Sequence, residues 1–211
     1  MRADADGRDD LAGLKLIADS VCVDFLNTVE RGVRYRHRDW IDSYAALVRW
    51  SEKAGAVGSD EVRALLKQSA THSRRASRVL SKAVRLRNVL RELFAAISAG
   101  TAPSSRAIDD LNEFLVEANT ARMVEWTSRG PIWKWRSDSV ELERPLWSIT
   151  MSAAELMTSP TVNHVRNCAN PQCSWMFVDS SKNKTRRWCE MKVCGNQSKA
   201  REHYAKMRAS K

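Results

Sequence analysis

Apolar residues recur at intervals of three and four along most of the first 160 residues, which is the spacing of an amphipathic helix. The longest such stretch lies within 69–99 and ends at Gly100, and its apolar stripe is Leu86, Val89, Leu90, Leu93, Phe94 and Ile97. Shorter stretches predict further helices at about residues 19–29, 42–54, 59–66, 103–115 and 145–157. The pattern therefore predicts a mainly helical first domain.

The period changes to two on either side of the turn signal Arg129-Gly130-Pro131. Segments 123–127 and 132–137 flank this turn, and Trp133 and Trp135 alternate to one side, so a β-hairpin is predicted. Tryptophans on one face of a hairpin are more often core residues than ligand contacts, and we expect this face to be buried. The predicted fold class is α+β.

Three regions follow from the composition along the chain. Residues 1–13 are charged and small without periodicity, which predicts disorder. The helical domain spans 14–160 and ends at Thr158-Ser159-Pro160, and a separate module occupies 161–211. No apolar run approaches the roughly 20 residues of a membrane span. The polar N-terminus does not resemble an export signal, so the expected compartment is the cytoplasm.

Four of the five cysteines form two matched pairs, Cys168-x4-Cys173 and Cys189-x4-Cys194. Clustered pairs in a chain without an export signal indicate metal ligands rather than disulfides. Four thiolates complete the tetrahedral shell of zinc and leave no position for water or substrate. The sequence therefore predicts one structural zinc ion. Cys22 lies in an apolar setting and is interpreted as a buried packing residue.

The segment between the two pairs predicts a second hairpin, with 175–178 as one strand, a turn at 179–184 and 186–188 as the return strand. After Cys194, Gly195 is expected to allow a sharp turn and Asn196 to cap a final helix. Apolar positions of that helix fall at i, i+4 and i+7, which predicts packing on the zinc hairpin; they are Ala200, Tyr204 and Met207. The expected module is a small treble-clef-like zinc finger.

Most of the net charge of +10 belongs to this module. Residues 164–211 contain eleven lysines and arginines against three acidic residues. Such a concentration favours a polyanionic partner, although a solvated basic surface remains the alternative. The candidate nucleic-acid contacts are Lys182, Lys184, Arg186, Arg187, Asn196, Lys199, Arg201, His203, Lys206 and Arg208. A second basic face, at 74–85, is interpreted as a solvated helix surface.

The run from Cys168 through Cys173-Ser-Trp-Met-Phe-Val-Asp179 and Arg187-Trp188-Cys189 to Cys194-Gly195-Asn196 resembles the CGNR zinc finger. Upstream, residues 21–28 (VCVDFLNT) together with Trp50 and Ala54-Gly55 resemble the ABATE domain that precedes this finger in bacterial proteins. The resemblance covers about 14–208 and implies a stress-induced transcription regulator with a DNA-binding finger. Gln197 stands where the finger's name places arginine, which removes one cation from the start of the final helix.

Three polar residues, Asp24, Asn27 and Thr28, share one face of the otherwise apolar first helix. Polar groups at such positions need partners when buried. One interpretation is an internal network with an arginine of the 31–38 segment; the other is a pocket for a small-molecule effector.

The predicted function is zinc-dependent DNA binding in transcription control. Binding to RNA or the ribosome is an alternative, because phosphate contacts do not distinguish the two nucleic acids. A protein-interaction adaptor is another, and it predicts weak dependence on salt. The sequence shows no nucleophile–base pair, phosphate-binding loop or open metal site, so an enzyme is not expected.

Overall fold

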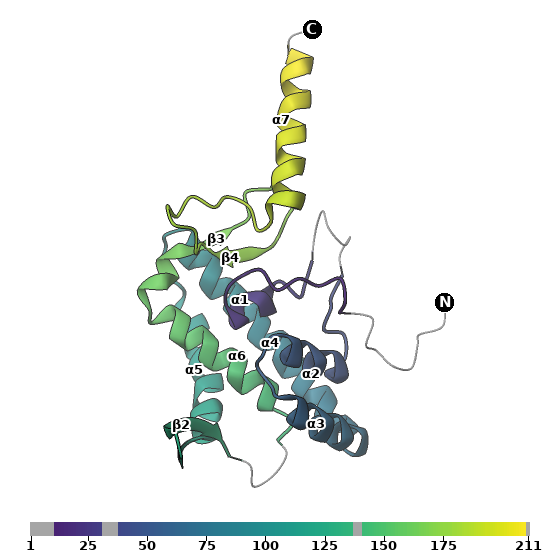
Figure 1. Cartoon of the computed structure of the whole chain (residues 1–211), viewed down its shortest axis with the longest axis vertical. Coiled ribbons are helices and arrows are strands. Elements are labelled where there is room, and N and C mark those ends of the chain that lie inside the picture. Colours follow the sequence, from purple (N-terminus) through teal and green to yellow (C-terminus); the bar gives the residue numbers. More distant parts are fainter. Residues whose placement is uncertain (1–10, 31–37, 137–140, 210–211) are drawn as a thin grey trace, which may run out of the picture.

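The structure is a computed structural model that describes residues 11–30, 38–136 and 141–209. Six helices build the first domain, and each predicted helix has a counterpart among them (Figure 1). They are α1 (Val21–Leu26), α2 (Tyr44–Lys53), α3 (Ser59–Thr71), α4 (Ser73–Ser98), α5 (Ser105–Thr120) and α6 (Arg144–Met157). The 26-residue α4 contacts all five others, so it is the central element on which the domain is assembled.

Local chemistry sets the ends of these helices. The Ser43 hydroxyl accepts a hydrogen bond from the Ala46 N–H at the start of α2, and Gly55, at φ 69°, follows its last turn. The sequence predicts Ser59 as the cap of α3, but this is wrong by one position because Ser59 is already helical. Gly58 precedes the helix instead, and its N–H donates to the Glu61 carboxylate. The Glu61 carboxylate thus provides the hydrogen-bond acceptor for the backbone N–H that precedes α3.

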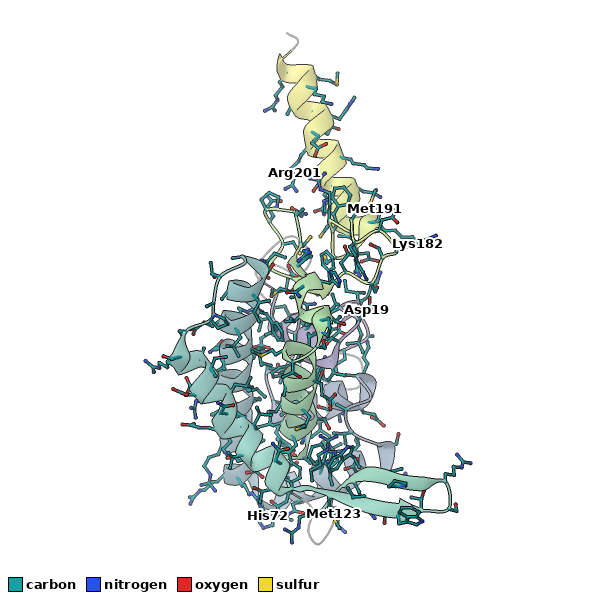
Figure 2. All side chains as sticks on the ribbon, turned by 90° about the vertical axis from the view of Figure 1, so that its left-hand side faces the viewer. Asp19, His72, Met123, Lys182, Met191 and Arg201 are labelled. Atoms are coloured by element: carbon teal, nitrogen blue, oxygen red, sulfur yellow. The ribbon has the colours of Figure 1, made fainter. Side chains whose placement is uncertain are left out.

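The predicted hairpin consists of β1 (Arg122–Thr127) and β2 (Gly130–Trp135), which pair antiparallel. The expectation that its tryptophan face is buried is wrong. Trp133 is 62% exposed and Trp126 on the neighbouring strand is 80% exposed, whereas only Trp135 packs inward, against Trp147 of α6. The hairpin projects sideways from the helices near the end opposite the C-terminus, so no second layer covers its outer part (Figure 2).

Strands β3 (Val165–Asn167) and β4 (Met176–Val178) form a second antiparallel pair beyond the short helix η1 (Pro160–His164). Side chains of this pair, including Phe177, belong to the same continuous hydrophobic core as Leu26 of α1 and Phe94 of α4. The Val178 N–H also donates to the Ala18 carbonyl. The zinc-binding segment therefore shares a core with the helical domain.

Two predictions concern segments at the margin of the described residues. Residues 11–13 form a turn and Leu11 is buried, so the predicted N-terminal disorder does not extend to Leu11. The rest of that prediction lies outside the described residues, as does most of the basic segment 31–38, of which Arg38 stacks on the Trp40 ring. Within the described part of the chain, no helix is long and apolar enough to cross a membrane.

Candidate metal centre and nucleic-acid interface

The four predicted zinc ligands meet at one point, from two different backbone structures. Cys168 and Cys173 bracket the turn that joins β3 to β4, where the Cys168 N–H donates to the Trp175 carbonyl. Cys189 ends the following loop, and Cys194 lies in the wide turn Met191–Gly195 that opens the last helix, α7 (Asn196–Ala209). One pair from a hairpin turn and one from a helix start is the treble-clef arrangement that the sequence predicted.

The sulfur atoms fit a zinc ion. All four lie within 4.8 Å of one another, with 3.7 Å between the Cys173 and Cys189 sulfurs and 3.5 Å between those of Cys189 and Cys194. A tetrahedral ion with Zn–S bonds of about 2.3 Å separates its sulfurs by about 3.8 Å. His164 and His203 are not part of this group, so the shell consists of the four cysteines.

The close spacing of the four thiols also favours the binding of a cation. The Cys168 sulfur accepts hydrogen bonds from its neighbours, first from Cys173, and this lowers the pKa of Cys168. The same contacts with Cys168 raise the pKa of Cys173 and of Cys189 above the ordinary thiol value. Four thiolates at this spacing would repel one another, and a bound divalent cation removes that repulsion while holding every thiol deprotonated.

The strand pairing inside the finger differs from the prediction. We expected 175–178 to pair with 186–188, but β4 pairs with β3, upstream of Cys168. The return segment makes a single backbone contact instead, from the Ala169 N–H to the Arg187 carbonyl. The first cysteine pair, rather than the turn at 179–184, thus forms the tip of the hairpin. This leaves 179–188 as a loop held by Asp179, whose carboxylate accepts from Ser181 and from the Arg186 N–H.

The last helix has the predicted position but different packing. Its side chains from 202 to 208 are all exposed, and Tyr204 and Met207 are 66% and 53% exposed. The predicted packing of Ala200, Tyr204 and Met207 on the zinc hairpin is therefore wrong, because α7 leaves the module along its own axis and stands clear of the body (Figure 1). Among the described side chains of α7, only Ser198 is buried.

The two residues that were expected to shape the helix start act differently. Asn196 is itself helical, and its side-chain amide donates to the Lys192 carbonyl, so it is not a cap. Gly195 does not adopt a positive φ. A Cβ at this position would come within 2.4 Å of the Met191 sulfur, so the Met191 side chain packs directly on this glycine.

The ten candidate nucleic-acid residues divide into two groups. Eight of them are exposed, on the loop 179–188 and along α7; they are Lys182, Lys184, Arg187, Asn196, Lys199, His203, Lys206 and Arg208. Arg186 and Arg201 are only partly exposed and are engaged within the protein. The Arg186 guanidinium donates to the carbonyls of Ile17 and Cys189 and lies over the Phe177 ring. Arg186 thus ties the finger to the first domain.

Arg201 belongs to a polar cluster that the sequence analysis missed. Its guanidinium donates to the side chains of Gln172, at 2.9 Å, and Asn170, at 2.5 Å, and the Asn170 amide donates to Gln197. Asn170 is fully buried within the first cysteine turn. The cluster fixes the first turn of α7 against the zinc turn, and Gln197 has a defined role there in place of a cation. The polar run Asn170-Pro171-Gln172 between Cys168 and Cys173 was the feature of the sequence that could have indicated this cluster.

Helix α1 ends at Leu26, short of the predicted end near residue 29, so only Asp24 of the three polar residues lies within it, and all three are satisfied internally. Asp24 accepts from the N–H groups of Ile17 and Ala18, and burial raises the pKa of Asp24 to about 6. The Asn27 amide makes a pair of bonds with the backbone of Met176 in β4, at 2.8 and 2.9 Å. Neither residue lines a described cavity.

Thr28 joins a network whose arginine comes from α4, whereas the sequence analysis had placed it in the 31–38 segment. Arg87 donates to the Thr28 hydroxyl at 2.9 Å and forms an ion pair with Asp39 at 2.5 Å. Arg87 is buried and interrupts the apolar stripe of α4, between Ala83 and Leu90, which was the signal in the sequence. Cys22 is buried as predicted, and burial raises the pKa of its thiol to about 11.

The fold and the cysteine site define a helical domain joined to a zinc finger. Comparison with family models is consistent with this division: residues 164–207 match the CGNR zinc finger. Residues 19–160 match the ABATE family, described as "putative stress-induced transcription regulator", and the chain belongs to this family. A comparison with curated proteins gives no match.

Proposed function

We propose that this chain is a zinc-dependent DNA-binding regulator of transcription, and that it acts by binding rather than by catalysis. The observation that carries the proposal is α7, a 14-residue helix that is anchored at its base by the zinc turn and exposed beyond it. At 1.5 Å per residue this helix is about 21 Å long. The major groove of B-DNA admits a helix of this kind.

The charges that remain exposed support a polyanionic partner. With four thiolates and one zinc ion counted, residues 164–211 carry a net charge of about +6. Exposed cations follow α7 and the adjoining loop 179–188; they are Lys182, Lys184, Arg187, Lys199, Lys206 and Arg208. Tyr204 and Met207 add apolar surface to the same helix, where they would meet sugars or thymine methyl groups.

Among the described residues of the first domain, the basic face of α4 is largely paired with acidic side chains. On α4, Arg75 pairs with Glu141 and Glu143, Lys82 with Glu117, and Arg85 with Glu113 and Asp110. These acidic partners neutralise most of the basic face at 74–85. The proposal therefore assigns nucleic-acid binding to the finger, with the first domain as the regulatory part.

The test is fluorescence anisotropy with labelled DNA duplexes across a salt series. If about five phosphates are contacted, the log–log slope is about −4.5, roughly a 500-fold loss of affinity between 50 and 200 mM salt. Truncation after Ser198 keeps all four cysteines and the buried Ser198, and it should abolish binding. The double variant Lys199→Glu/Lys206→Glu should weaken binding to every sequence.

The matched control is Arg74→Glu/Arg78→Glu, which makes the same change of charge at exposed positions of α4. This variant should keep most of the affinity for DNA. Binding that survives the truncation, or equal losses in the two double variants, would contradict the assignment to α7. Structured RNA that displaces the duplex at lower concentration would shift the assignment to RNA, and a flat salt response would favour an adaptor.

A further inference from the structure

An apolar strip runs along the part of α7 that projects from the finger (Figure 1). Ala200 is exposed, and Tyr204 and Met207 are 66% and 53% exposed. Successive residues of an α-helix are rotated by about 100°, so these three side chains lie within a sector of about 60°. They form one continuous strip, the apolar seam. Exposed apolar surface that is bordered by charged residues marks an interaction site.

Cations lie on both sides of the apolar seam. The lysine flank, Lys199 and Lys206, is rotated from the centre of the seam by about 120° in one direction. The arginine flank, Arg201 and Arg208, is rotated by about 80° in the other direction. Glu202 is the single acidic residue of α7, and it lies on the side of the helix opposite the seam. Positive charge therefore borders the seam on both sides, and the negative charge faces away from it.

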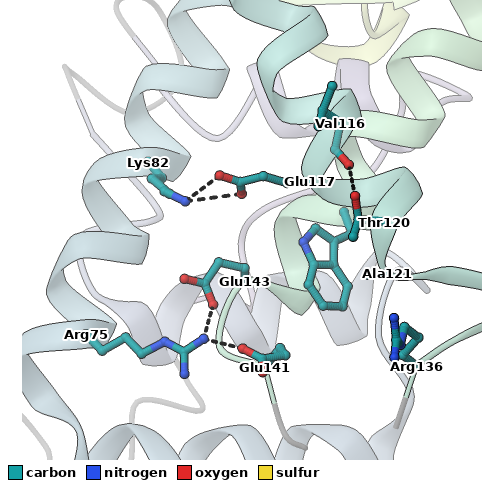
Figure 3. Close-up of a pocket in the computed structure, with 10 residues that line it drawn as sticks. Arg75, Lys82, Val116, Glu117, Thr120, Ala121, Arg136, Glu141 and Glu143 are labelled. Atoms are coloured by element: carbon teal, nitrogen blue, oxygen red, sulfur yellow. Dashed lines mark hydrogen bonds and ion pairs between the residues drawn. The ribbon is translucent and has the colours of Figure 1, made fainter. Parts of the chain in front are cut away.

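Arg201 is held in place without losing its charge. At the base of α7 its guanidinium donates to the side-chain oxygens of Asn170 and Gln172, which are neutral amides (Figure 2). The cations of α4 differ, because their acceptors are carboxylates, as for Lys82 and Glu117 in Figure 3. The charge of α4 is thus cancelled locally, whereas the charge of Arg201 acts on an anion that approaches α7.

This cross-section matches the major groove of B-DNA. The groove is about 12 Å wide and admits one helix, with base edges on its floor and a phosphate backbone along each side. From Ala200 to Met207 the seam is about 10 Å long, which corresponds to about three base pairs. The apolar group that base pairs present in the major groove is the C5 methyl group of thymine, and the minor groove has none.

We infer that α7 lies in the major groove with the apolar seam toward the base edges, where Tyr204 and Met207 contact thymine methyl groups. The lysine flank contacts the phosphates of one strand, and the arginine flank contacts those of the other. The seam therefore determines the sequence preference, and the flanks supply affinity that does not depend on sequence. This inference rests on the proposed DNA binding and identifies the chemical group that the helix recognises.

Two duplexes isolate the methyl group. One alternates dA and dT, and the other has dU in place of every dT, so the two differ only in the C5 methyl groups of the major groove. Burial of one methyl group strengthens binding about fourfold. In fluorescence anisotropy, the full-length zinc-loaded protein should therefore bind the dT duplex at least about fourfold more tightly than the dU duplex.

Two alanines of α7 provide a matched pair of variants. Ala200→Gln and Ala205→Gln place the same neutral side chain at exposed positions, one on the seam and the other about 130° from its centre. Ala200→Gln should hold the seam away from the base edges, so its affinity for the dT duplex should fall to that for the dU duplex. Ala205→Gln should leave both affinities unchanged. Zinc content and far-UV circular dichroism check that both variants keep the finger and the helix.

The flanks are tested separately from the seam. Lys199→Gln and Arg208→Gln each remove one charge from one flank. Each should lower the slope of log affinity against log salt by about 1. The preference for the dT duplex should be unchanged in both variants, because the two duplexes have the same phosphates.

The possible failures are distinguishable. If the wild-type protein bound neither duplex, both the proposed function and this inference would be overturned. Equal affinity for the two duplexes, or equal effects of Ala200→Gln and Ala205→Gln, would overturn the inference alone. A dimer in sedimentation that Ala200→Gln converts to a monomer would also overturn it, because the seam would then be a contact between two copies of α7.

Discussion

Asn27 is the side chain on which the joint between the two parts of the protein depends most directly. It lies at the C-terminal end of α1, is 1% exposed, and makes both a donor and an acceptor bond to the backbone of Met176 in the finger. Its amide therefore takes the place of a neighbouring strand at the edge of β4. Asn27→Ala would leave the N–H and the carbonyl of the buried Met176 without partners.

The cost can be worked from these two groups. A buried backbone group that loses its partner costs about 1–3 kcal/mol, so two of them give about 2–6 kcal/mol. A domain of ordinary stability has only about 5–15 kcal/mol in total. Asn27→Asp should cost at least as much, because it keeps the acceptor for the Met176 N–H but places a second oxygen against the Met176 carbonyl.

The measurement is urea unfolding followed by far-UV circular dichroism, with zinc present in excess. Asn112→Ala is the control, since Asn112 is exposed on α5 and makes no side-chain bond that the structure shows. The expected result is a large fall in midpoint for the Asn27 variants and little change for the control. A loss below about 1 kcal/mol in Asn27→Ala would refute the reasoning, because the paired bonds could not then be as described.

Purified protein should contain one zinc per chain by metal analysis, and Cys194→Ser should lower the stability of the helical domain as well as the finger, because Phe177 shares its core. Two independent unfolding transitions, with the first unaffected by a chelator, would contradict this. Asp24→Asn should change the pH dependence of stability. Burial raises the folded-state pKa of Asp24 from 3.8 to about 6, so the folded state binds the proton more tightly and wild-type stability falls as pH rises from about 4 to 6. Urea titrations at each pH should show the free energy of unfolding of the wild type falling by about 2–3 kcal/mol relative to that of Asp24→Asn over this range. Parallel profiles for the two proteins would show that the carboxyl titrates normally.

The sequence by itself determined the elements and the metal ligands. Apolar period and glycine stops are local properties, so they located the helices within a few residues, as at Gly100 after α4. Two matched cysteine pairs sufficed for the zinc ligands, because the coordination chemistry of zinc requires them to meet wherever the chain runs. The resemblance to the ABATE and CGNR families came from short local motifs of the same kind.

Tertiary structure decided which faces are covered and which partners polar groups choose. The i, i+4 spacing of Ala200 and Tyr204 would serve a packed helix equally well, but α7 leaves the module in a direction that no local pattern encodes. The exposed Trp133 has the same cause, since burial depends on whether another layer arrives over the hairpin. Asn27 and Arg87 were recognisable as polar residues on apolar faces. Their partners, Met176 and Asp39, lie 149 and 48 residues away in the sequence, and such contacts arise only when the chain is folded.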